Sequence, residues 1–536
     1  MGEVHSLSSK TKLIRAILPP EQRQKENLSI GVTPIWPHLN NFCSYTDFDP
    51  VLIIQIGFLS TNKIYKRSNT MKSFLKIIMC VILVSFSASH FASPQASPMK
   101  LWKKINIEAY KGSYICLGDL DNDKQVDFLL YREGPMTTPG YLVAVNFKGK
   151  LLWELGDKSI KIHAKDGDGS EPALRGIALV YDINQDGKSE VIAELWKENN
   201  IWLCIIDGET GKILQERLSP FDKRVRGGER SRCHPVGMVA YLNGKNNPPS
   251  IVLKYSASSN VPCYVAALNA NLDILWMRRL NNHAAGHIPT VGDVDRDGKD
   301  EILVGAMLID DDGNPLWMKE NPKHADCTAI ADVIPENQGD ELFMSICSTG
   351  PAYCMSVDGK TLWEKTKEEV RHGQGIWIGN FVDERKGPEA IILCSGHTGD
   401  FMTVDAKNGE TITKFKQKRK YEAYPDFPCP VNWISTDIQS LWIPVDRILV
   451  DGYGNKVVDT DEYEKLIENT LHWGESKENL AVQIFAVDLC GDERDEIVMF
   501  QPREGEGILI FSQTDSDMEK KDYIHKKDIY NIRTYY

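Results

Sequence analysis

A short acidic loop between two apolar segments recurs along this chain and limits the folds that the chain can adopt. Its fullest copy lies within Thr290–Trp317, which reads TVGDVDRDGKDEILVGAMLIDDDGNPLW. Asp293, Asp295 and Asp297 alternate, a glycine follows, and Glu301 closes the run, an order typical of calcium loops. The apolar run after the loop and the DDDGN turn beyond it predict consecutive β-strands. Each unit is therefore expected to be a strand, an acidic loop and a meander.

The unit recurs from about residue 99 onward. GDLDNDKQVDFLLY and YDINQDGKSEVIAE repeat the acidic loop, whereas the later copies around Asp332, Asn380, Asn432 and Asp488 are degenerate. About eight units recur at roughly 40 to 60 residues, the spacing of four-stranded propeller blades. The sequence therefore predicts an all-β protein with a single eight-bladed β-propeller over residues 99–536.

The three fullest loops are predicted to bind Ca²⁺, because this ion prefers carboxylate and amide oxygens. We expect the ions to hold the blade turns in place rather than to take part in a reaction, since such loops recur outside any one pocket. The loops at Asp332 and Asp488 depart from the pattern and receive no metal. The predicted ligands are Asp119, Asp121, Asp123 and Asp127; Asp182, Asn184, Asp186 and Glu190; and Asp293, Asp295, Asp297 and Glu301.

The second half of each unit carries a Leu-Trp pair or its remnant. Trp153, Trp276, Trp317 and Trp363 occupy this place, and we expect them to pack between blades. A further LW segment at residues 100–107 precedes the first unit. This segment is predicted to complete the last blade, which would remove the free strand edges at the seam of the ring.

The first 96 residues carry no such unit. Residues 71–96 have a basic start, an apolar run and a patch of small residues, the three parts of a secretory signal peptide. We therefore expect residues 1–70 to lie upstream of the true start, and the mature protein to be secreted or periplasmic, with no stable membrane insertion after cleavage. The alternative is an N-terminal extension with an internal signal-anchor helix.

The net charge limits the kinds of molecule that the protein can bind, and the cysteines raise the question of disulfides. The net charge of −13 argues against general nucleic-acid binding, and we expect a monomer. Secretion permits disulfides. Cys347 and Cys354 flank a hairpin turn and are the first predicted pair, and Cys233 with Cys263 is the second. No cysteine pair has the spacing of a zinc site.

Several segments together resemble the rhamnogalacturonan lyases of polysaccharide lyase family 11. The resemblance is carried by HIPTVGDVDRDGKDEI, GAMLIDDDG, the KHADC segment, VYDINQDGKSEVIAE and the closing VDLCGDERDEIVMF, and it extends from about Gly118 to the C-terminus. It implies an eight-bladed propeller with structural calcium. It also implies β-elimination at a rhamnose–uronate linkage, so that the expected partner is a uronic-acid-containing polysaccharide.

Histidine and arginine gather just before the acidic loops, where the inner strands of the blades should begin. Five of the twelve histidines fall in such positions. Removing a proton next to a uronate carboxylate needs a base, for which histidine is suited, and a cation that neutralises the carboxylate. The candidate catalytic residues are His287, His324, Arg371, His372, Arg175 and His234. We expect His287 or His324 to be the base and Arg371 and Arg175 to bind carboxylates.

Other readings of these residues remain open. A transition metal held by His234, His287 and His324 is one alternative, and histidines that only cap strand starts are another. Lys161, His163, Arg226 and Arg230 lie in long loops and are second-rank candidates. The main alternative function is a carbohydrate-binding propeller without catalysis. A glycoside hydrolase ranks lowest, because most of the acids belong to the predicted calcium loops.

Overall fold

The computed structural model describes residues 96–111, 114–133, 138–160, 176–221, 234–256, 263–280, 286, 289–319, 325–347, 350–395, 399–417, 428–444, 446–472, 483–501 and 505–515. They belong to a compact unit that spans Ala92–Tyr536. The predicted upstream segment and signal peptide lie outside the described residues. None of the helices described is long and apolar enough to cross a membrane.

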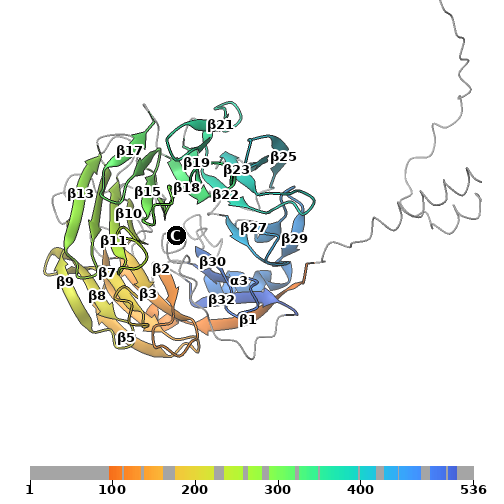
Figure 1. Ribbon diagram of the computed structural model, residues 1–536. Helices are drawn as coiled ribbons and strands as arrows, with labels where there is room; N and C mark the ends of the chain where they lie inside the picture. The colour runs from red at the N-terminus through yellow and green to blue at the C-terminus, as the bar shows by residue number, and fades with distance from the viewer. Residues whose placement is uncertain are drawn as a thin grey trace, which may run out of the picture. The chain divides into compact units, whose positions relative to one another are not determined.

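Eight four-stranded antiparallel sheets form a ring, each a propeller blade, with the first strand innermost (Figure 1). The predicted eight-bladed β-propeller is confirmed. Blade 1 contains β2 (Tyr114–Gly118), β3 (Asp127–Glu133), β4 (Pro139–Val145) and β5 (Leu151–Gly156). Blade 2 contains β6 (Ala178–Tyr181), β7 (Glu190–Lys197), β8 (Asn200–Asp207) and β9 (Ile213–Leu218). Blade 3 contains β10 (His234–Ala240), β11 (Ser250–Ser256), β12 (Cys263–Leu268) and β13 (Ile274–Leu280).

The next three blades repeat this order. Blade 4 contains β14 (Thr290–Gly292), β15 (Glu301–Val304), β16 (Met307–Ile309) and β17 (Pro315–Met318). Blade 5 contains β18 (Ala325–Ala331), β19 (Glu341–Ile346), β20 (Ala352–Met355) and β21 (Thr361–Lys365). Blade 6 contains β22 (Gly375–Gly379), β23 (Glu389–Ser395), β24 (Asp400–Asp405) and β25 (Thr411–Lys416).

The last two blades carry the helical segments and the seam. Blade 7 contains β26 (Cys429–Val431), β27 (Ser440–Ile443), β28 (Ile448–Val450) and β29 (Lys456–Asp459). Two short helices follow it, η3 (Asp461–Tyr463) and α3 (Glu464–Leu471), and another, η1 (Glu108–Tyr110), precedes β2. Blade 8 contains β30 (Gln483–Val487), β31 (Glu496–Phe500), β32 (Gly507–Gln513) and, as its outer strand, β1 (Met99–Asn106).

The pairing of β1 with β32 joins the two ends of the described chain. The strands run antiparallel from Met99 opposite Gln513 to Asn106 opposite Gly507. The Ser97 hydroxyl lies 2.8 Å from that of Thr514, and the Trp433 indole donates to the Ser97 carbonyl at 2.9 Å. The predicted closing strand is therefore present, and it covers the edge of β32 at the seam of the ring.

The repeated tryptophans join neighbouring blades. Each indole nitrogen donates to a backbone carbonyl of the next blade: Trp153 to Gly208 at 2.6 Å, Trp276 to Asp311 at 2.8 Å, Trp317 to Val357 at 2.9 Å and Trp363 to Ala406 at 2.8 Å. Each ring also lies against the turn glycine of that blade, for example Trp276 against Gly313, whose φ of +84° suits glycine. The predicted role between blades is confirmed.

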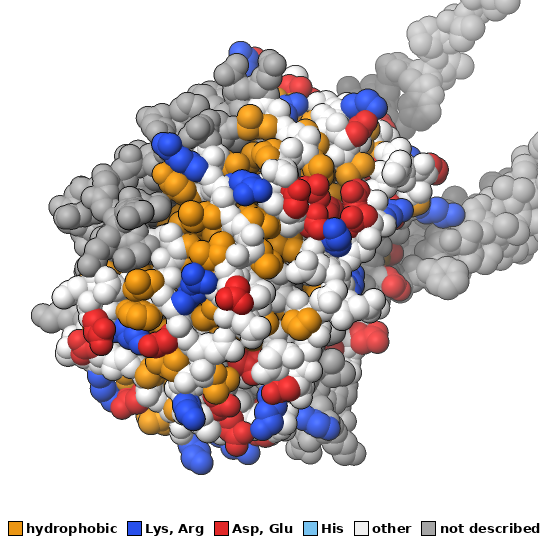
Figure 2. All heavy atoms as spheres, turned by 60° about the vertical axis from the view of Figure 1, so that its left-hand side comes forward, with side chains coloured by type: hydrophobic (Ala, Val, Ile, Leu, Met, Phe, Trp, Pro, Cys, Tyr) orange, Lys and Arg blue, Asp and Glu red, His pale blue; other side chains and the backbone are white. Residues whose placement is uncertain are grey.

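The outer strands expose apolar side chains as well as charges. Figure 2 shows hydrophobic side chains interspersed with charged ones on the face that lies to the left in Figure 1, where β9, β13 and β17 lie. The exposed members are Leu214, Leu218, Ile274, Leu275, Met277, Leu316 and Met318. Three other tryptophans, Trp377, Trp433 and Trp442, are buried and belong to the core.

The first predicted disulfide is wrong. Cys347 and Cys354 are both buried, and they are not joined by a disulfide. The antiparallel ladder of β19 and β20 places Cys354 opposite Phe343, four residues before Cys347. The two sulfurs therefore belong to different levels of the blade. The second predicted pair falls on Cys233, outside the described residues, and on Cys263, whose side chain is not described.

Candidate functional site

The acid that closes each acidic loop also begins the second strand of its blade. In six described blades this carboxylate accepts a hydrogen bond from a backbone N–H of the preceding loop. In blade 4, Val294 N–H donates to Glu301 Oε2 at 2.8 Å, and in blade 1 Leu120 N–H donates to Asp127 Oδ2 at 2.8 Å. The closing acid thus fixes the loop whether or not a cation is bound.

The closing acids of blades 1 and 4 each have a second oxygen without a hydrogen bond to any described residue. Asp127 Oδ1 and Glu301 Oε1 are buried and have no hydrogen-bond partner in the described part of the chain, and the same holds for Asp121 Oδ1 and Asp293 Oδ1 in the same loops. Burial raises the pKa of Asp127 to about 7 and that of Glu301 to about 8. A bound cation would offset this penalty on the charged form. These donor sets fit a calcium ion.

The grouping of carboxylates identifies the same two loops. The ligand oxygens of Asp119, Asp121 and Asp127 lie within 4.8 Å of one another, and those of Asp293, Asp295 and Asp297 do likewise. Asp123 instead accepts the Gln125 N–H at 2.9 Å through Oδ1.

The loop of blade 2 differs from the loops of blades 1 and 4. The Asn184 amide donates to Glu190 Oε1 at 3.0 Å and to Asp186 at 3.2 Å. An amide nitrogen therefore faces the oxygen that a calcium ion would need. The predicted site at Asp182, Asn184, Asp186 and Glu190 has the expected loop, but its closing acid is satisfied by the protein.

In the degenerate loops another side chain lies next to the closing acid: it donates a hydrogen bond in blades 5 and 8, whereas in blade 6 Glu389 Oε1 has no hydrogen bond from a described residue and faces a cation instead. Asn337 donates to Glu341 Oε1 at 2.8 Å in blade 5, and Ser512 donates to Glu496 Oε1 at 3.0 Å in blade 8. In blade 6 the Arg385 guanidinium lies 3.5 Å from Glu389 Oε1 and 2.6 Å from Asp405. A cationic side chain thus stands where blades 1 and 4 offer a place for an ion.

Blades 3 and 7 have a serine in place of the closing acid, Ser250 and Ser440. An aspartate of the following blade takes over its function in each case. Asp300 accepts the Tyr241 N–H at 2.7 Å, and Asp495 accepts the Asn432 N–H at 2.8 Å.

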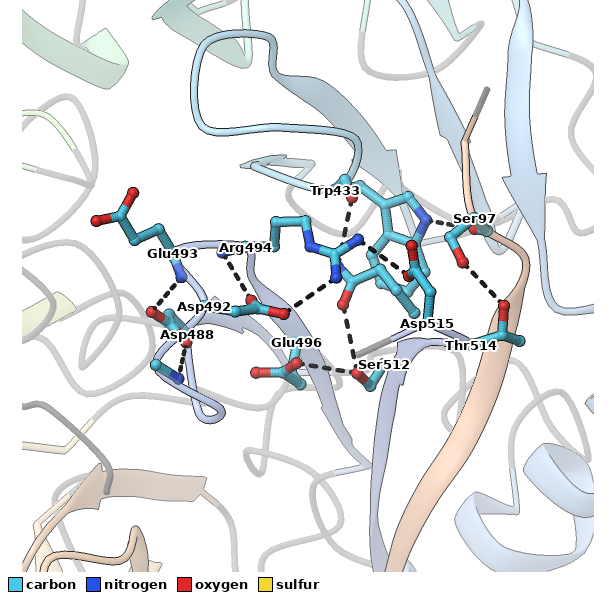
Figure 3. Close-up of polar contacts among 12 residues, drawn as sticks. Ser97, Trp433, Asp488, Asp492, Glu493, Arg494, Glu496, Ser512, Thr514 and Asp515 are labelled. Atoms are coloured by element: carbon cyan, nitrogen blue, oxygen red, sulfur yellow. Dashed lines mark hydrogen bonds and ion pairs between the residues drawn. The ribbon is translucent and has the colours of Figure 1, made fainter. Parts of the chain in front are cut away.

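The loop of blade 8 lies beside the seam (Figure 3). Arg494 lies 3.0 Å from Asp492 in its own loop and 3.0 Å from Asp515 after β32. Asp488 accepts the Glu493 N–H at 2.9 Å. An arginine therefore neutralises Asp492 at this loop.

The predicted catalytic residues are only partly described. Arg175, His287 and His324 lie outside the described residues, as do the second-rank candidates Lys161, His163, Arg226 and Arg230. His234 is the first residue of the inner strand β10, and its side chain is not described. Arg371 and His372 lie four and three residues before Gly375, the first residue of the inner strand β22, in the segment that leads into it as the sequence predicted.

Arg371 is an exposed cation at this end of blade 6. Its side chain is 65% exposed, and its guanidinium lies 3.2 Å from the Asp400 carboxylate. Lys416 on the outer strand β25 pairs with the same carboxylate at 3.3 Å. Exposed ion pairs are weak, and guanidinium has five donors. Arg371 can therefore also bind an external carboxylate.

His372 belongs to a compact group of side chains between blades 5 and 6. Its Nε2 lies 3.3 Å from the Cys347 sulfur, and ligand atoms of Asp326, Cys347 and His372 all lie within 4.8 Å of one another. Asp326 and Cys347 are buried. Sequence reasoning missed both as site residues. The KHADC segment, which puts His324 and Asp326 two residues apart, was the available signal.

Backbone contacts hold this group in place. His372 N–H donates to the Cys394 carbonyl and Gly373 N–H to the Ile346 carbonyl, both at 3.1 Å. A Cβ on Gly373 would lie 2.2 Å from Ser345 Oγ, so the close approach requires glycine. The segment before β22 is thereby fixed against the end of β19, next to Cys347.

Comparisons with known proteins agree with this fold. The model of "Rhamnogalacturonan lyase family 11, C-terminal domain" matches residues 198–534. The chain is 27% identical over 302 residues to rhamnogalacturonan exolyase YesX of Bacillus subtilis, covering 47% of this chain and 48% of the relative. It is 26% identical over 302 residues to rhamnogalacturonan endolyase YesW of the same organism, covering 47% of each. The chain thus spans about half the length of these curated relatives.

Solved structures show the same fold. A crystal structure of rhamnogalacturonan lyase YesW superposes with a TM-score of 0.54 at 18% identity, covering 83% of this chain and 81% of that one. A rhamnogalacturonan lyase of Bacillus licheniformis gives a TM-score of 0.52 at 17% identity, covering 83% and 79%. At these identities the likeness concerns the fold alone.

Proposed function

Because the chain belongs to rhamnogalacturonan lyase family 11, we propose that it is a secreted polysaccharide lyase that cleaves a rhamnose–uronic acid glycan by β-elimination. The observation that carries this proposal is the match of the family model over residues 198–534, together with the named relatives. Secretion is supported by the signal-peptide pattern of residues 71–96.

β-Elimination sets clear demands on the protein. A base removes the proton on the carbon next to the uronate carboxylate, a carbon–carbon double bond forms, and the glycosidic carbon–oxygen bond at the neighbouring carbon breaks. The leaving oxygen then takes up a proton. Negative charge spreads onto the carboxylate during the first step, so a fixed cation there lowers the barrier.

Arg371 is the described residue best suited to bind that carboxylate. Its guanidinium is exposed at the start of an inner strand and can donate two parallel hydrogen bonds to a carboxylate. We assign Arg175 the same role and His287 or His324 the role of base, as the sequence predicted. His372 contacts Cys347 through Nε2, which favours a positioning role for it over that of the base.

We propose calcium as a structural ion of the loops in blades 1 and 4. Asp119, Asp121 and Asp127 would hold one ion, and Asp293, Asp295, Asp297 and Glu301 the other. The ion would neutralise the buried closing acid and so keep the loop at the top of its blade rigid.

The test follows the ultraviolet absorbance of the unsaturated uronate that β-elimination leaves in the product. The purified protein is incubated with rhamnogalacturonan and calcium. We expect absorbance to rise, and Arg371→Ala to lower kcat/KM by about 100-fold or more, the usual effect of losing a group that stabilises transition-state charge.

Lys416→Ala is the matched control, since it removes the other cation from Asp400 but lies on the outer strand. It should keep near-normal activity. No absorbance change on any rhamnose–uronate polysaccharide, with retention of the protein on one of them in an affinity gel, would contradict a lyase and make this a carbohydrate-binding propeller.

A further inference from the structure

Five lysines gather at the seam of the ring, where β1 runs along blade 8 toward blade 1 (Figure 1). Residues 97–107 and 134–153 contain no Asp or Glu, although acids outnumber Lys and Arg in the whole chain by 75 to 62. The β4–β5 turn of blade 1 lies against β1, because a Cβ on Gly149 would be 3.3 Å from the Ile105 side chain. The lysines are Lys100, Lys103 and Lys104 on β1, and Lys148 and Lys150 on the turn.

Three of these lysines carry charges that the protein does not neutralise. Within the described part of the chain, the ammonium groups of Lys103, Lys148 and Lys150 have no ion pair and no hydrogen bond, and Lys148 and Lys150 are exposed. Lys416 on the outer strand of blade 6 instead pairs with Asp400 at 3.3 Å. The charges at the seam therefore remain available to an external anion.

Two aromatic rings lie among these lysines. Trp102 of β1 and Phe147 of the turn have ring centroids 5.2 Å apart, with their planes inclined by 52°. The Lys103 ammonium lies 5.0 Å from the centroid of the Phe147 ring, within range of a cation–π interaction. Both rings are partly exposed and pack with their other side on the core between blades 8 and 1. The seam thus presents a fixed aromatic surface bordered by cations.

We propose that this seam patch binds an acidic polysaccharide at a site separate from the proposed catalytic site. Sugar rings have apolar faces that pack on aromatic rings, and a uronate carboxylate is attracted by the lysine ammonium groups. The rings are partly buried and held against the core, which suits a sugar chain lying along the surface better than insertion into a membrane. The patch consists of Trp102, Lys103, Phe147, Lys148 and Lys150.

The seam patch and Arg371 lie at opposite ends of the blade strands. Arg371 leads into the first strand of blade 6, whereas the patch includes the turn between the third and fourth strands of blade 1. Because neighbouring strands are antiparallel, that turn is at the end where a first strand finishes. A polymer held at the patch would have a raised local concentration at the catalytic end. This use of the patch rests on the proposed function, whereas binding itself does not.

Affinity electrophoresis with soluble polygalacturonate tests the proposal. Arg371→Ala is the background of every variant, so that the proposed carboxylate contact of blade 6 does not contribute. We expect retention that disappears at about 1 M salt, where charges are strongly screened, and that is absent with the neutral methyl-esterified polymer.

Charge reversal at the patch should weaken this binding. Lys103→Glu combined with Lys148→Glu should raise the dissociation constant about tenfold, because two attractions become repulsions. Phe147→Leu should raise it about fivefold, because leucine keeps the packing on the core but loses the ring.

Lys245→Glu combined with Lys386→Glu is the matched control. Both lysines are exposed, and they lie in loops of blades 3 and 6, away from the seam. The control changes the net charge by the same amount as the reversal at the patch, and it should keep the binding. Circular dichroism and thermal melting confirm that each variant is folded.

Three outcomes would overturn the proposal: unchanged retention after charge reversal at the patch, an equal loss in the control, or binding to phosphatidylserine vesicles without retention on polygalacturonate. The last result would make the patch a membrane-binding surface. Each leaves the lyase proposal intact, because that proposal is tested by product formation. Conversely, a protein that binds polygalacturonate through the patch but releases no unsaturated product would keep this site and lose the lyase.

Discussion

Blades 1 and 4 differ from blades 2, 5, 6 and 8 in what lies next to the buried closing acid of the loop. In both groups a buried closing acid holds the loop by accepting its backbone N–H groups. In blades 1 and 4 the second oxygen of that acid has no partner among the described residues. Asn184, Asn337 and Ser512 donate to it in blades 2, 5 and 8, and Arg385 lies 3.5 Å from it in blade 6. In all of these blades the closing acid holds the loop. A metal ion is one of several groups that can neutralise the remaining negative charge of that acid.

This difference predicts which blades depend on calcium. Burying a charged carboxylate is costly unless a partner neutralises it. Where the partner is a side chain, its contribution to stability does not depend on calcium. Where the partner is an ion, stability depends on the free calcium concentration.

The largest effect is expected for Glu301→Ala. This change removes the acceptor of the Val294 N–H and a ligand of the proposed ion at once, and we expect a loss of about 3–5 kcal/mol in the free energy of unfolding. Urea denaturation in calcium measures it. In a chelator the loss should shrink, because the wild-type protein has then also lost the ion. An equal loss in both solutions would separate Glu301 from calcium.

Arg385→Ala should have a smaller effect that calcium does not change. It leaves the Glu389 carboxylate, 1% exposed, without its cation. Because Arg385 is itself partly exposed, we expect a loss of about 1–2 kcal/mol. The same urea experiment is run with calcium and with chelator. A calcium-dependent loss would show that an ion binds in blade 6 despite the arginine.

Asn184→Asp should have the smallest effect, and its sign should depend on calcium. The new carboxylate completes the oxygen set of blade 2, so we expect a gain of about 1 kcal/mol at calcium a few-fold above its dissociation constant. In chelator it should destabilise the protein through repulsion of Glu190. Asn337→Asp is the control, since two acids of its loop, Asp332 and Asp340, are already paired with Arg296. A gain without calcium would contradict this interpretation.

Much of the fold could be predicted because its determinants are local and repeated. The acidic loop, the turn and the tryptophan recur within each unit, so the blade count, the inter-blade role of Trp276 and the closing strand at β1 could be read from the sequence. Each is confirmed.

The relations between units could not be predicted. Asp300 and Asp495 serve the loop of the preceding blade, and nothing in their own segments distinguishes them from ordinary loop acids. The direction of the Asn184 amide depends on Glu190 and is equally hidden in the sequence.

The group at Asp326 shows the same limit. The sequence predicted a disulfide between Cys347 and Cys354, because the two residues flank a hairpin turn. The actual neighbour of Cys347 is His372, because blade 6 packs on blade 5. Contacts of this kind depend on the ring as a whole.

The most direct test of the difference between the blades is the number of calcium ions bound, measured by equilibrium dialysis with radioactive calcium. Glu301→Ala and Asp127→Ala should each bind one ion fewer than the wild-type protein, and Glu190→Ala should bind the same number. Loss of an ion in Glu190→Ala, or an unchanged number in the other two variants, would contradict the claim that calcium binds where no side chain faces the second oxygen of the closing acid.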